Sequence, residues 1–415
     1  MQVADEIRSR YPYMMFRRHW RLDSDVVYQI GQCEAMVEAI CETPIQPAYR
    51  KDLLRVSLNK GAQATTAIEG NTLTTDEVKK VAEGVELPKS KAYQAQEVSN
   101  ILGAMNGILN AVYTEQYSAV LTPELIRDFH RNVGKDLGDH FDAIPGRFRT
   151  DERIVGPYKC PRAVDVEKLV KALCEWLPTE FGYPSGRQTF MQAVVQAIVT
   201  HVYLEWIHPF GDGNGRTGRL LEFYILLRAN NPDIASHILS NHYNETRPEY
   251  YRQLDRAHKD CDLTAFIRYA VQGYLDGLMD TLTIVQNSAT EVAWRYLVYS
   301  EFAKVQHAGP KQIKRDVIRR RRELVLAMAP ESDYALNELT LLTTELAKMY
   351  ASLSTRTLLR DVAELKAMDL IETTNDRWRT NLGLLLPQFA KRKSRSKSAG
   401  VAAAGKPPTE EPVKP

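Results

Sequence analysis

One short segment of the chain combines residue types that carry phosphate chemistry. Residues 208–219 contain a histidine, a carboxylate, an amide, two arginines and several glycines, in the order HPFGDGNGRTGR. Glycines at positions 211, 213 and 215 disfavour a helix interior, whereas residues 190–206 and 216–228 on either side have apolar helical patterns. A loop that leads into a helix presents unpaired N–H groups at the positive end of the helix dipole, a common device for holding phosphate. The segment therefore predicts a phosphate-binding loop.

The side chains of this loop fit the same chemistry. Asp212 offers a hard oxygen ligand for Mg²⁺. Asn214 can donate to a phosphate oxygen, and Arg216 and Arg219 are spaced to share one face of the following helix. His208 has a pKa that allows proton abstraction near neutral pH. A buried histidine in a helix-connecting loop would explain His-Pro alone, but it would not explain the whole combination.

The segment resembles the Fic family motif, HPFxDGNGRxxR, at every defined position, and the resemblance extends over roughly residues 50–285. The resemblance implies that His208 is the general base and that Asp212 is the Mg²⁺ ligand. It implies that Arg216 and Arg219 clamp phosphates of ATP, with Arg219 nearest the γ-phosphate. The cradle for the α- and β-phosphates would be formed by Gly213, Asn214 and Gly215.

Two other segments resemble parts of the same family. Residues 146–157 contain a short extended stretch bracketed by glycine and proline, which predicts a β-hairpin. The resemblance implies that this hairpin is a flap that aligns the target segment by strand pairing. Tyr250 and Tyr251 resemble a pair that borders the adenine site, although tyrosines on an amphipathic helix are often core residues. His258 departs from the asparagine often found there, which leaves nucleotide selectivity open.

Glu69 stands out because a carboxylate is disfavoured in the last turn of a helix. A helix is expected over residues 52–68, with its end at Gly70-Asn71. A solvated glutamate is one explanation. Residues 65–70, TTAIEG, also resemble the inhibitory motif [S/T]xxxE[G/N] of the Fic family, which implies that Glu69 pairs with Arg219. Such a pair would remove the γ-phosphate clamp, so that ATP would bind in a pose unsuited to in-line attack.

Helical periodicity dominates up to about residue 285, and strand-like alternation is rare. We therefore expect an all-α Fic-fold domain with a small β-hairpin flap, followed by a winged helix-turn-helix domain. The expected regions are an N-terminal helical region with the inhibitory helix at 1–115, the Fic catalytic core at 116–285, a winged-helix-like domain at 290–388 and a disordered tail at 389–415.

The winged-helix expectation rests on the pattern after residue 290. Helices are expected at 311–328 and 336–349, and a third begins after Ser354; two short strands follow around a turn at 375–376. The third helix is expected to have one apolar face formed by Leu358, Leu359, Val362 and Leu365.

The charges on that third helix help to indicate whether the domain binds DNA or protein. Arg356 and Arg360 lie one turn apart on its polar side, a layout compatible with phosphate contacts. Asp361 and Glu364 interrupt this positive surface. We therefore favour protein recognition or dimerisation over DNA binding for this domain, and DNA binding stays open as the alternative.

Composition sets further bounds. The chain has 415 residues, 44% hydrophobic and 26% charged, with a net charge of +2, which is ordinary globular composition and excludes a fibrous or wholly disordered protein. No apolar run reaches the roughly 20 residues of a membrane-spanning helix, and no export signal is visible. We expect a cytoplasmic protein without a membrane segment. Five scattered cysteines without a CxxC pair argue against a disulfide framework and against a zinc site.

The resemblance implies a protein adenylyltransferase that uses MgATP and is restrained by Glu69. His208 would deprotonate a Ser, Thr or Tyr hydroxyl of a protein target, which could be the chain itself; that hydroxyl would attack the α-phosphorus and expel pyrophosphate. The intact Gly-Asn-Gly sequence favours adenylylation over transfer of phosphate or phosphocholine. Two alternatives stay open: removal of AMP with Glu69 directing water, and a DNA-binding regulator whose Fic domain senses nucleotide. The sequence identifies neither the target, nor a homodimer, nor the signal that relieves inhibition.

Overall fold

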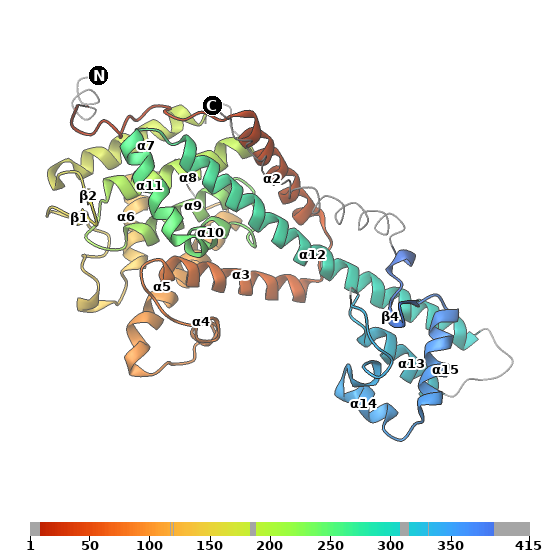
Figure 1. Ribbon diagram of the computed structural model, residues 1–415. Helices are drawn as coiled ribbons and strands as arrows, with labels where there is room; N and C mark the ends of the chain where they lie inside the picture. The colour runs from red at the N-terminus through yellow and green to blue at the C-terminus, as the bar shows by residue number, and fades with distance from the viewer. Residues whose placement is uncertain are drawn as a thin grey trace, which may run out of the picture. The chain divides into compact units, whose positions relative to one another are not determined.

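The computed structural model describes residues 9–116, 118, 120–182, 188–307, 315–330 and 332–385. The chain divides into two compact units, residues 1–285 and 286–415 (Figure 1). Helices dominate both units, and the described strands form two small antiparallel hairpins, which confirms the predicted all-α class. The tail predicted at 389–415 lies outside the described residues.

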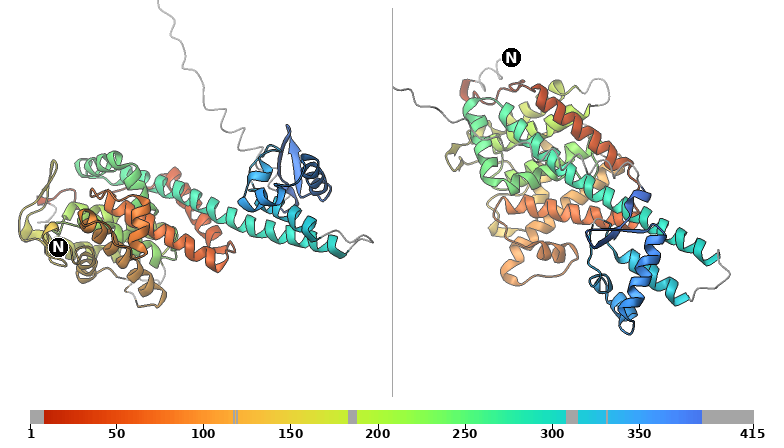
Figure 2. Two further views of the ribbon diagram at one scale, coloured as in Figure 1. Left: turned by 90° about the horizontal axis from the view of Figure 1, so that it is seen from below. Right: turned by 45° about the vertical axis from the view of Figure 1, so that its right-hand side comes forward.

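The first unit is a helical domain built around two buried helices. α8 (Phe190–Ile207) and α9 (Asn214–Arg228) pack against each other more extensively than any other pair of elements, and almost all of their residues are buried. Both lie among the other helices of this unit (Figures 1 and 2). α8 is apolar on nearly every side, as expected at the centre of a large domain, whereas α9 also buries the charged residues Arg216, Arg219 and Glu222. The helices around them are α2 (Ser24–Glu42), α3 (Pro47–Ala67), α4 (Thr75–Ala82), α5 (Ala92–Tyr113), α6 (Pro123–Val133), α7 (Val166–Glu180), α10 (Ile238–Glu245), α11 (Arg247–Asp260) and the first part of α12 (Thr264–His307).

Local signals in the sequence set the ends of the helices that matter here. Thr122 caps α6, with Pro123 in the first turn. Thr189 and its partner Gln192 form a capping box at the start of α8. α3 ends at Ala67, and Gly70 follows with a φ of 101°, a backbone conformation that glycine adopts without strain. The predicted stop of this helix at Gly70 is therefore confirmed.

The first hairpin differs in position from our prediction. β1 (Ile154–Val155) pairs with β2 (Tyr158–Lys159), so the hairpin covers 154–159 and not 146–157. Gly156 and Pro157, which we took for the end of the hairpin, form its turn; Gly156 has a φ of 55°, which suits a tight reversal. Residues 147–153 lead into the hairpin without a strand partner of their own.

The second unit has its own core and begins with the last part of α12. It continues with α13 (Arg315–Ala327), η5 (Leu339–Leu341), α14 (Thr344–Tyr350), α15 (Thr355–Ala367), β3 (Ile371–Thr374), β4 (Arg377–Thr380) and η6 (Leu382–Leu384). β3 and β4 pair around Asn375 and Asp376, whose φ values of 51° and 59° suit a two-residue hairpin turn. Helices followed by a two-stranded hairpin match the expected order of elements, and the assignment as a winged helix stays a prediction.

One face of α15 was predicted incorrectly. Leu359 is 48% exposed, while Asp361 is fully buried and accepts hydrogen bonds from Arg320 and Arg321, both at 2.8 Å, and from Tyr350 at 3.0 Å. Residues one apart on a helix differ by about 100° in direction, so Leu359 cannot share a face with its neighbour Leu358. Asp361 can be buried on the same face as Leu358 because Arg320 and Arg321 neutralise its negative charge.

The described residues also bear on two expectations from composition. None of the helices in these ranges is long and apolar enough to cross a membrane. All five cysteines are free thiols, and Cys33, Cys160 and Cys174 are buried.

Candidate active site

His208 lies where the buried helix α8 ends. Its backbone N–H donates to the carbonyl of Leu204 at 2.9 Å, and its φ of 48° falls in the left-handed region, so the chain turns sharply there. Such a φ is uncommon for a residue other than glycine and persists where the surrounding contacts fix it. Burial, and after it the charge of Arg149, lowers the pKa of the His208 imidazole to about 4. The ring is therefore neutral near pH 7, as a proton acceptor must be.

The loop after His208 is closed by the side chain of Asn214. The amide oxygen of Asn214 accepts from the N–H of Phe210, and the amide nitrogen donates to the Phe210 carbonyl, both at 2.9 Å. One N–H of this amide is thus used within the loop, and donation to phosphate by Asn214 stays a prediction. Phe210 is fully buried and anchors the loop.

His130 on α6 supports the same loop. Its ring stacks on Phe210 with the centroids 3.6 Å apart. The N–H of Gly146 donates to Nδ1 of His130 at 2.9 Å, so Nε2 carries the proton and donates to the carbonyl of Asp212, also at 2.9 Å. Burial lowers the pKa of His130 to about 4, which keeps this neutral form. Our sequence reasoning missed His130 because an isolated histidine has no local signature.

Glu69 lies against Arg219, the arginine that the resemblance indicated. Its Oε1 is 2.5 Å from Nη2 of Arg219, and the same Nη2 donates to the carbonyl of Thr65 at 2.9 Å. Burial raises the pKa of the Glu69 carboxyl, but the charge and hydrogen bond of Arg219 outweigh this effect, and the pKa is lowered overall. The last turn of α3 and the residues after it thus hold Arg219 at two points.

Two other acids near Arg219 do little to balance its positive charge, so Glu69 provides most of the compensation. Burial, followed by the charge of Glu69, raises the pKa of Glu205 to about 7. Burial also raises the pKa of Glu222 well above its usual value, although this residue accepts a hydrogen bond from Tyr243 at 2.9 Å. With a pKa of about 7, Glu205 is only partly ionised near neutral pH, and burial disfavours the charged form of Glu222. Glu69 supplies the main negative charge beside the buried guanidinium.

Gly215 forms the floor under this ion pair. A Cβ at Gly215 would collide with Oε1 of Glu69 and would lie 2.8 Å from Nη1 of Arg219. Gly215 is the second residue of α9, and Gly213 is its N-cap with a φ of 77°. The Glu69 carboxylate therefore lies at the N-terminus of a helix, where the helix dipole favours an anion.

Arg216 is paired with other acids. Its guanidinium contacts Oδ1 of Asp212 at 2.7 Å and also forms an ion pair with Glu97 on α5; only 4% of the Arg216 side chain is exposed. Glu97 also accepts a hydrogen bond from Asn71 at 3.1 Å, and Asn71 lies two residues after Glu69. The turn after α3 therefore contacts Arg219 directly, through Glu69, and is linked to Arg216 through Glu97. Our sequence reasoning missed Glu97, since a glutamate within a long helix ordinarily faces solvent.

Comparison with known proteins identifies the domain that contains this loop. Residues 120–226 match the model of the Fic/DOC family. This segment is a Fic/DOC domain. It begins just before α6 and extends through most of α9, so it includes His208, Asp212, Arg216 and Arg219. The resemblance of this loop to the Fic family motif is confirmed.

Curated relatives of the Fic domain carry the name protein adenylyltransferase. The chain is 28% identical over 294 residues to protein adenylyltransferase fic-1 of Caenorhabditis elegans, which covers 63% of this chain and 54% of that protein. It is 30% identical over 209 residues to protein adenylyltransferase Fic of Nematostella vectensis, covering 50% and 45%, and 34% identical over 209 residues to that of Drosophila ananassae, covering 49% and 38%. The chain thus spans about half, or less, of the length of these relatives.

Solved structures show the same fold. A Fic family protein from Desulfovibrio desulfuricans superposes with a TM-score of 0.53 at 20% sequence identity, covering 88% of this chain and 98% of that one. Fic-1 from Caenorhabditis elegans superposes with a TM-score of 0.50 at 24% identity, covering 64% and 74%. At these identities the likeness establishes the Fic fold and nothing about activity.

The two tyrosines expected at the adenine site lie in different environments. Tyr250 is 1% exposed, and its hydroxyl lies 2.8 Å from Nε2 of His201, so it is part of the Fic domain core. Tyr251 is 46% exposed and donates to the carbonyl of Ile68 at 3.4 Å. Of the pair, Tyr251 is therefore the one accessible to a nucleotide. His258 packs edge-on against the ring of Tyr13, with the centroids 4.2 Å apart.

Asp212 has the properties expected of a Mg²⁺ ligand in the Fic domain. Its side chain is 31% exposed, and its Oδ1 is held by the N–H of Gly213 at 2.5 Å and by Arg216 at 2.7 Å. Among the described residues there is no group of three or more His, Cys, Asp or Glu side chains that could hold a metal by themselves. Mg²⁺ commonly binds through one or two carboxylates together with substrate phosphates and water. A single carboxylate beside a loop predicted to bind phosphate is consistent with this mode of Mg²⁺ binding.

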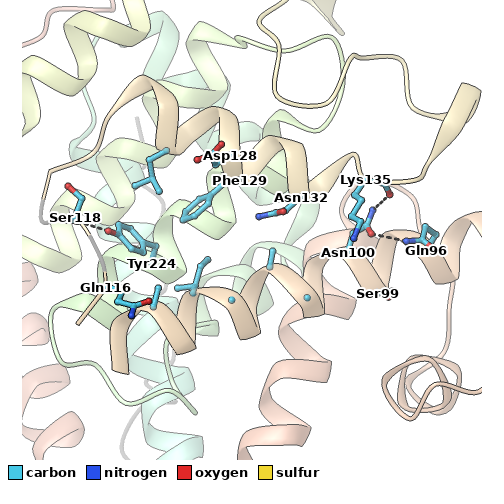
Figure 3. Close-up of a pocket in the computed structure, with 16 residues that line it drawn as sticks. Gln96, Ser99, Asn100, Gln116, Ser118, Asp128, Phe129, Asn132, Lys135 and Tyr224 are labelled. Atoms are coloured by element: carbon cyan, nitrogen blue, oxygen red, sulfur yellow. Dashed lines mark hydrogen bonds between the residues drawn. The ribbon is translucent and has the colours of Figure 1, made fainter. Parts of the chain in front are cut away.

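A groove of about 630 Å³ lies away from this loop, between α5 and α6 (Figure 3). Gly103 and Gly107 on α5 are among its lining residues, and Phe129 and Asn132 project from α6. None of the residues expected to bind nucleotide lines it.

Proposed function

We propose that this protein is an adenylyltransferase that moves AMP from ATP to a Ser, Thr or Tyr hydroxyl of a protein. The observation that carries the proposal is the ion pair between Glu69 and Arg219 at the N-terminus of α9. A carboxylate held there, beside a neutral histidine and glycines that leave no side chain in the way, indicates a site built for phosphate. The names of the curated relatives support the same reaction.

In the proposed reaction, the imidazole of His208 takes the proton of the target hydroxyl. The hydroxyl oxygen forms a bond to the α-phosphorus of ATP, the bond from that phosphorus to the bridging oxygen breaks, and pyrophosphate leaves. Arg216 and Arg219 neutralise negative charge on the phosphates, and the N–H groups of the first turn of α9 bind phosphate oxygens. Positioning and electrostatic stabilisation account for most of the rate in phosphate transfer.

Mg²⁺ has a place in this scheme beside Asp212. The metal would neutralise phosphate charge on bound ATP. Asp212 would offer a carboxylate oxygen to the metal. Arg216, which is already paired with Asp212, would stay close to the same phosphates.

Glu69 is proposed to restrain the enzyme. ATP has to compete with the Glu69 carboxylate for Arg219, and a nucleotide bound without that contact has its γ-phosphate unclamped. The α-phosphorus is then out of line with the attacking hydroxyl. A change that moves the residues after α3 would release Arg219.

The second unit is proposed to be a winged helix-turn-helix module that docks protein partners. The order of α13, α14, α15 and the β3–β4 hairpin supports this assignment. We also propose a cytoplasmic location, which suits the free thiols of the chain.

ATP labelled on either the α- or the γ-phosphorus tests the reaction. We expect the Glu69→Gly variant with Mg²⁺ to attach the α-label to protein and to leave the γ-label in pyrophosphate, and we expect His208→Ala in the same background to attach neither. Transfer of the γ-label would identify a kinase. Release of label from premodified protein by the wild type would identify AMP removal. Nucleotide binding without either reaction would favour a nucleotide sensor.

A further inference from the structure

Arg149 is a buried arginine that joins the loop at His208 to the hairpin β1–β2. Its Nε donates to the carbonyl of His208 at 2.7 Å, and its backbone N–H donates to the carbonyl of Pro209 at 2.9 Å. Its Nη1 donates to the carbonyl of Asp151, before β1, at 2.6 Å, and its Nη2 donates to the carbonyl of Pro161, after β2, at 2.5 Å. One side chain therefore holds the turn at His208 and both ends of the hairpin.

The partners of Arg149 are unusual for a buried charge. Only 6% of Arg149 is exposed, yet the acceptors of its side-chain hydrogen bonds are backbone carbonyls and not carboxylates. A buried charge is costly unless its donors are satisfied. The planar guanidinium places its donors in a fixed fork, so its orientation is determined by the carbonyls that it joins, which a lysine ammonium could not reproduce.

We propose that Arg149 is a positioning residue that makes the turn at His208 and the β1–β2 hairpin a single rigid body. The inference rests on the proposed function in one respect: a target segment aligned by the hairpin would be held at a fixed distance from the imidazole of His208. The left-handed φ of His208 requires such support, since its carbonyl is turned toward Arg149. Nothing in the sequence motif itself predicts this link.

Arg149 also contributes to the electrostatic environment of His208. The groups that act on the imidazole are Arg149 and Arg153 from the hairpin segment, Glu69 after α3 and the backbone carbonyl of Glu205 on α8. The two arginines lower the pKa of His208, whereas Glu69 and the Glu205 carbonyl raise it. Removal of the Arg149 charge should therefore raise the pKa of His208 from about 4 toward its ordinary value, and replacement by lysine should not.

The test compares Arg149→Lys with Arg149→Met in the full-length Glu69→Gly background. The pKa of His208 is read by NMR titration of the imidazole, with the spectrum of a His208→Ala variant for assignment, so this readout does not depend on catalysis. Of these two variants, only Arg149→Met should raise the pKa of His208. We expect both variants to lose about 10- to 100-fold in kcat for labelling with little change in the KM for ATP, because a small displacement of reacting groups has effects of that size.

Arg153→Met is the matched control. Arg153 also lowers the pKa of His208, but it forms ion pairs with Asp142 at 2.6 Å and Asp151 at 2.7 Å, and 28% of its side chain is exposed. We expect Arg153→Met to keep kcat. Faster amide hydrogen exchange over 151–161 in both Arg149 variants would support the rigid-body link. Unchanged exchange and kcat in Arg149→Lys would overturn the proposal. If the parent Glu69→Gly protein attaches no label but the expected changes in pKa and exchange are observed, only the adenylylation reaction is refuted.

Discussion

Replacement of Glu69 measures how strongly the ion pair restrains the site. Oε1 of Glu69 lies 2.5 Å from Nη2 of Arg219, whose side chain is 1% exposed, while the Glu69 side chain is 32% exposed. Breaking a fully buried pair costs about 3–5 kcal/mol, whereas an exposed pair contributes less than about 1 kcal/mol. With one partner buried and the other one-third exposed, an intermediate value of about 2–3 kcal/mol holds Arg219 away from ATP.

This energy converts directly into a rate. A free energy of about 2–3 kcal/mol corresponds to a factor of about 30 to 150, at about 1.4 kcal/mol per factor of ten. Below saturating ATP, Glu69→Gly should therefore raise the initial rate of label incorporation by about 30- to 150-fold over the wild type. Glu69→Gln keeps the shape of the side chain but removes its charge, so it should produce a smaller increase.

Glu83→Gln controls for the loss of a glutamate–arginine pair as such. Glu83 contacts Arg55 at 3.1 Å, but both of these side chains are nearly half exposed, at 44% and 45%. Its rate should equal that of the wild type. An unchanged rate in both Glu69 variants, or an equal increase in Glu83→Gln, would refute the idea that the contact with Arg219 is what limits activity.

Four further outcomes are expected. His208→Ala in the Glu69→Gly background should lose labelling by at least about 10², the lower end for a lost general base, while ATP binding measured by calorimetry persists. The labelling rate of Glu69→Gly should stay near its plateau down to about pH 5, because neutral His208 is the active form and its pKa is about 4, so that activity falls only as the pH drops through that value. Asp212→Ala should abolish the dependence of ATP affinity on Mg²⁺; identical metal titrations would show that the ligand lies elsewhere. DNA affinity of the full-length chain should change only about tenfold between about 50 and about 200 mM salt, and Arg356→Gln with Arg360→Gln should remove that dependence, since two phosphate contacts give a shallow slope.

The parts of the site that could be predicted from the sequence are those with a local signature. Glycines at 211, 213 and 215 mark a loop whatever surrounds it, and the spacing of Arg216 and Arg219 places them on one helix face. The positions of Glu69 and Gly70 at the end of α3 follow from helix-end signals alone. Each of these inferences depends on residues close together in the chain, so that packing against distant segments could not change it.

The supporting residues could not be predicted because their partners are far away in the chain. Glu97 reaches Arg216 across 119 positions, and Arg149 reaches His208 across 59. Neither the type nor the spacing of a single charged residue reveals whether it faces solvent or a buried charge. The position of the first hairpin was predicted incorrectly for a related reason. Gly156-Pro157 suits either a turn or a strand boundary, and the pairing of Ile154 with Lys159 decides between them.

The second unit shows how burial changes the meaning of a charge. We expected Asp361 to repel DNA, but it is fully buried and paired with Arg320 and Arg321, so it presents no negative charge to a partner. The same contacts withdraw both arginines from the surface, with side chains only 13% and 12% exposed. Five more arginines of this unit pair with glutamates: Arg295, Arg319, Arg322, Arg377 and Arg379.

Arg356 and Arg360 are thus the exposed arginines of α15, and within the described residues no ion pair is recorded for either. Two phosphate contacts are far fewer than the six to ten that make DNA affinity strongly salt-dependent. Repulsion by Asp361 is therefore no reason to disfavour DNA. Within α15, two exposed arginines are left for phosphate, and recognition of a protein partner stays our prediction for this unit.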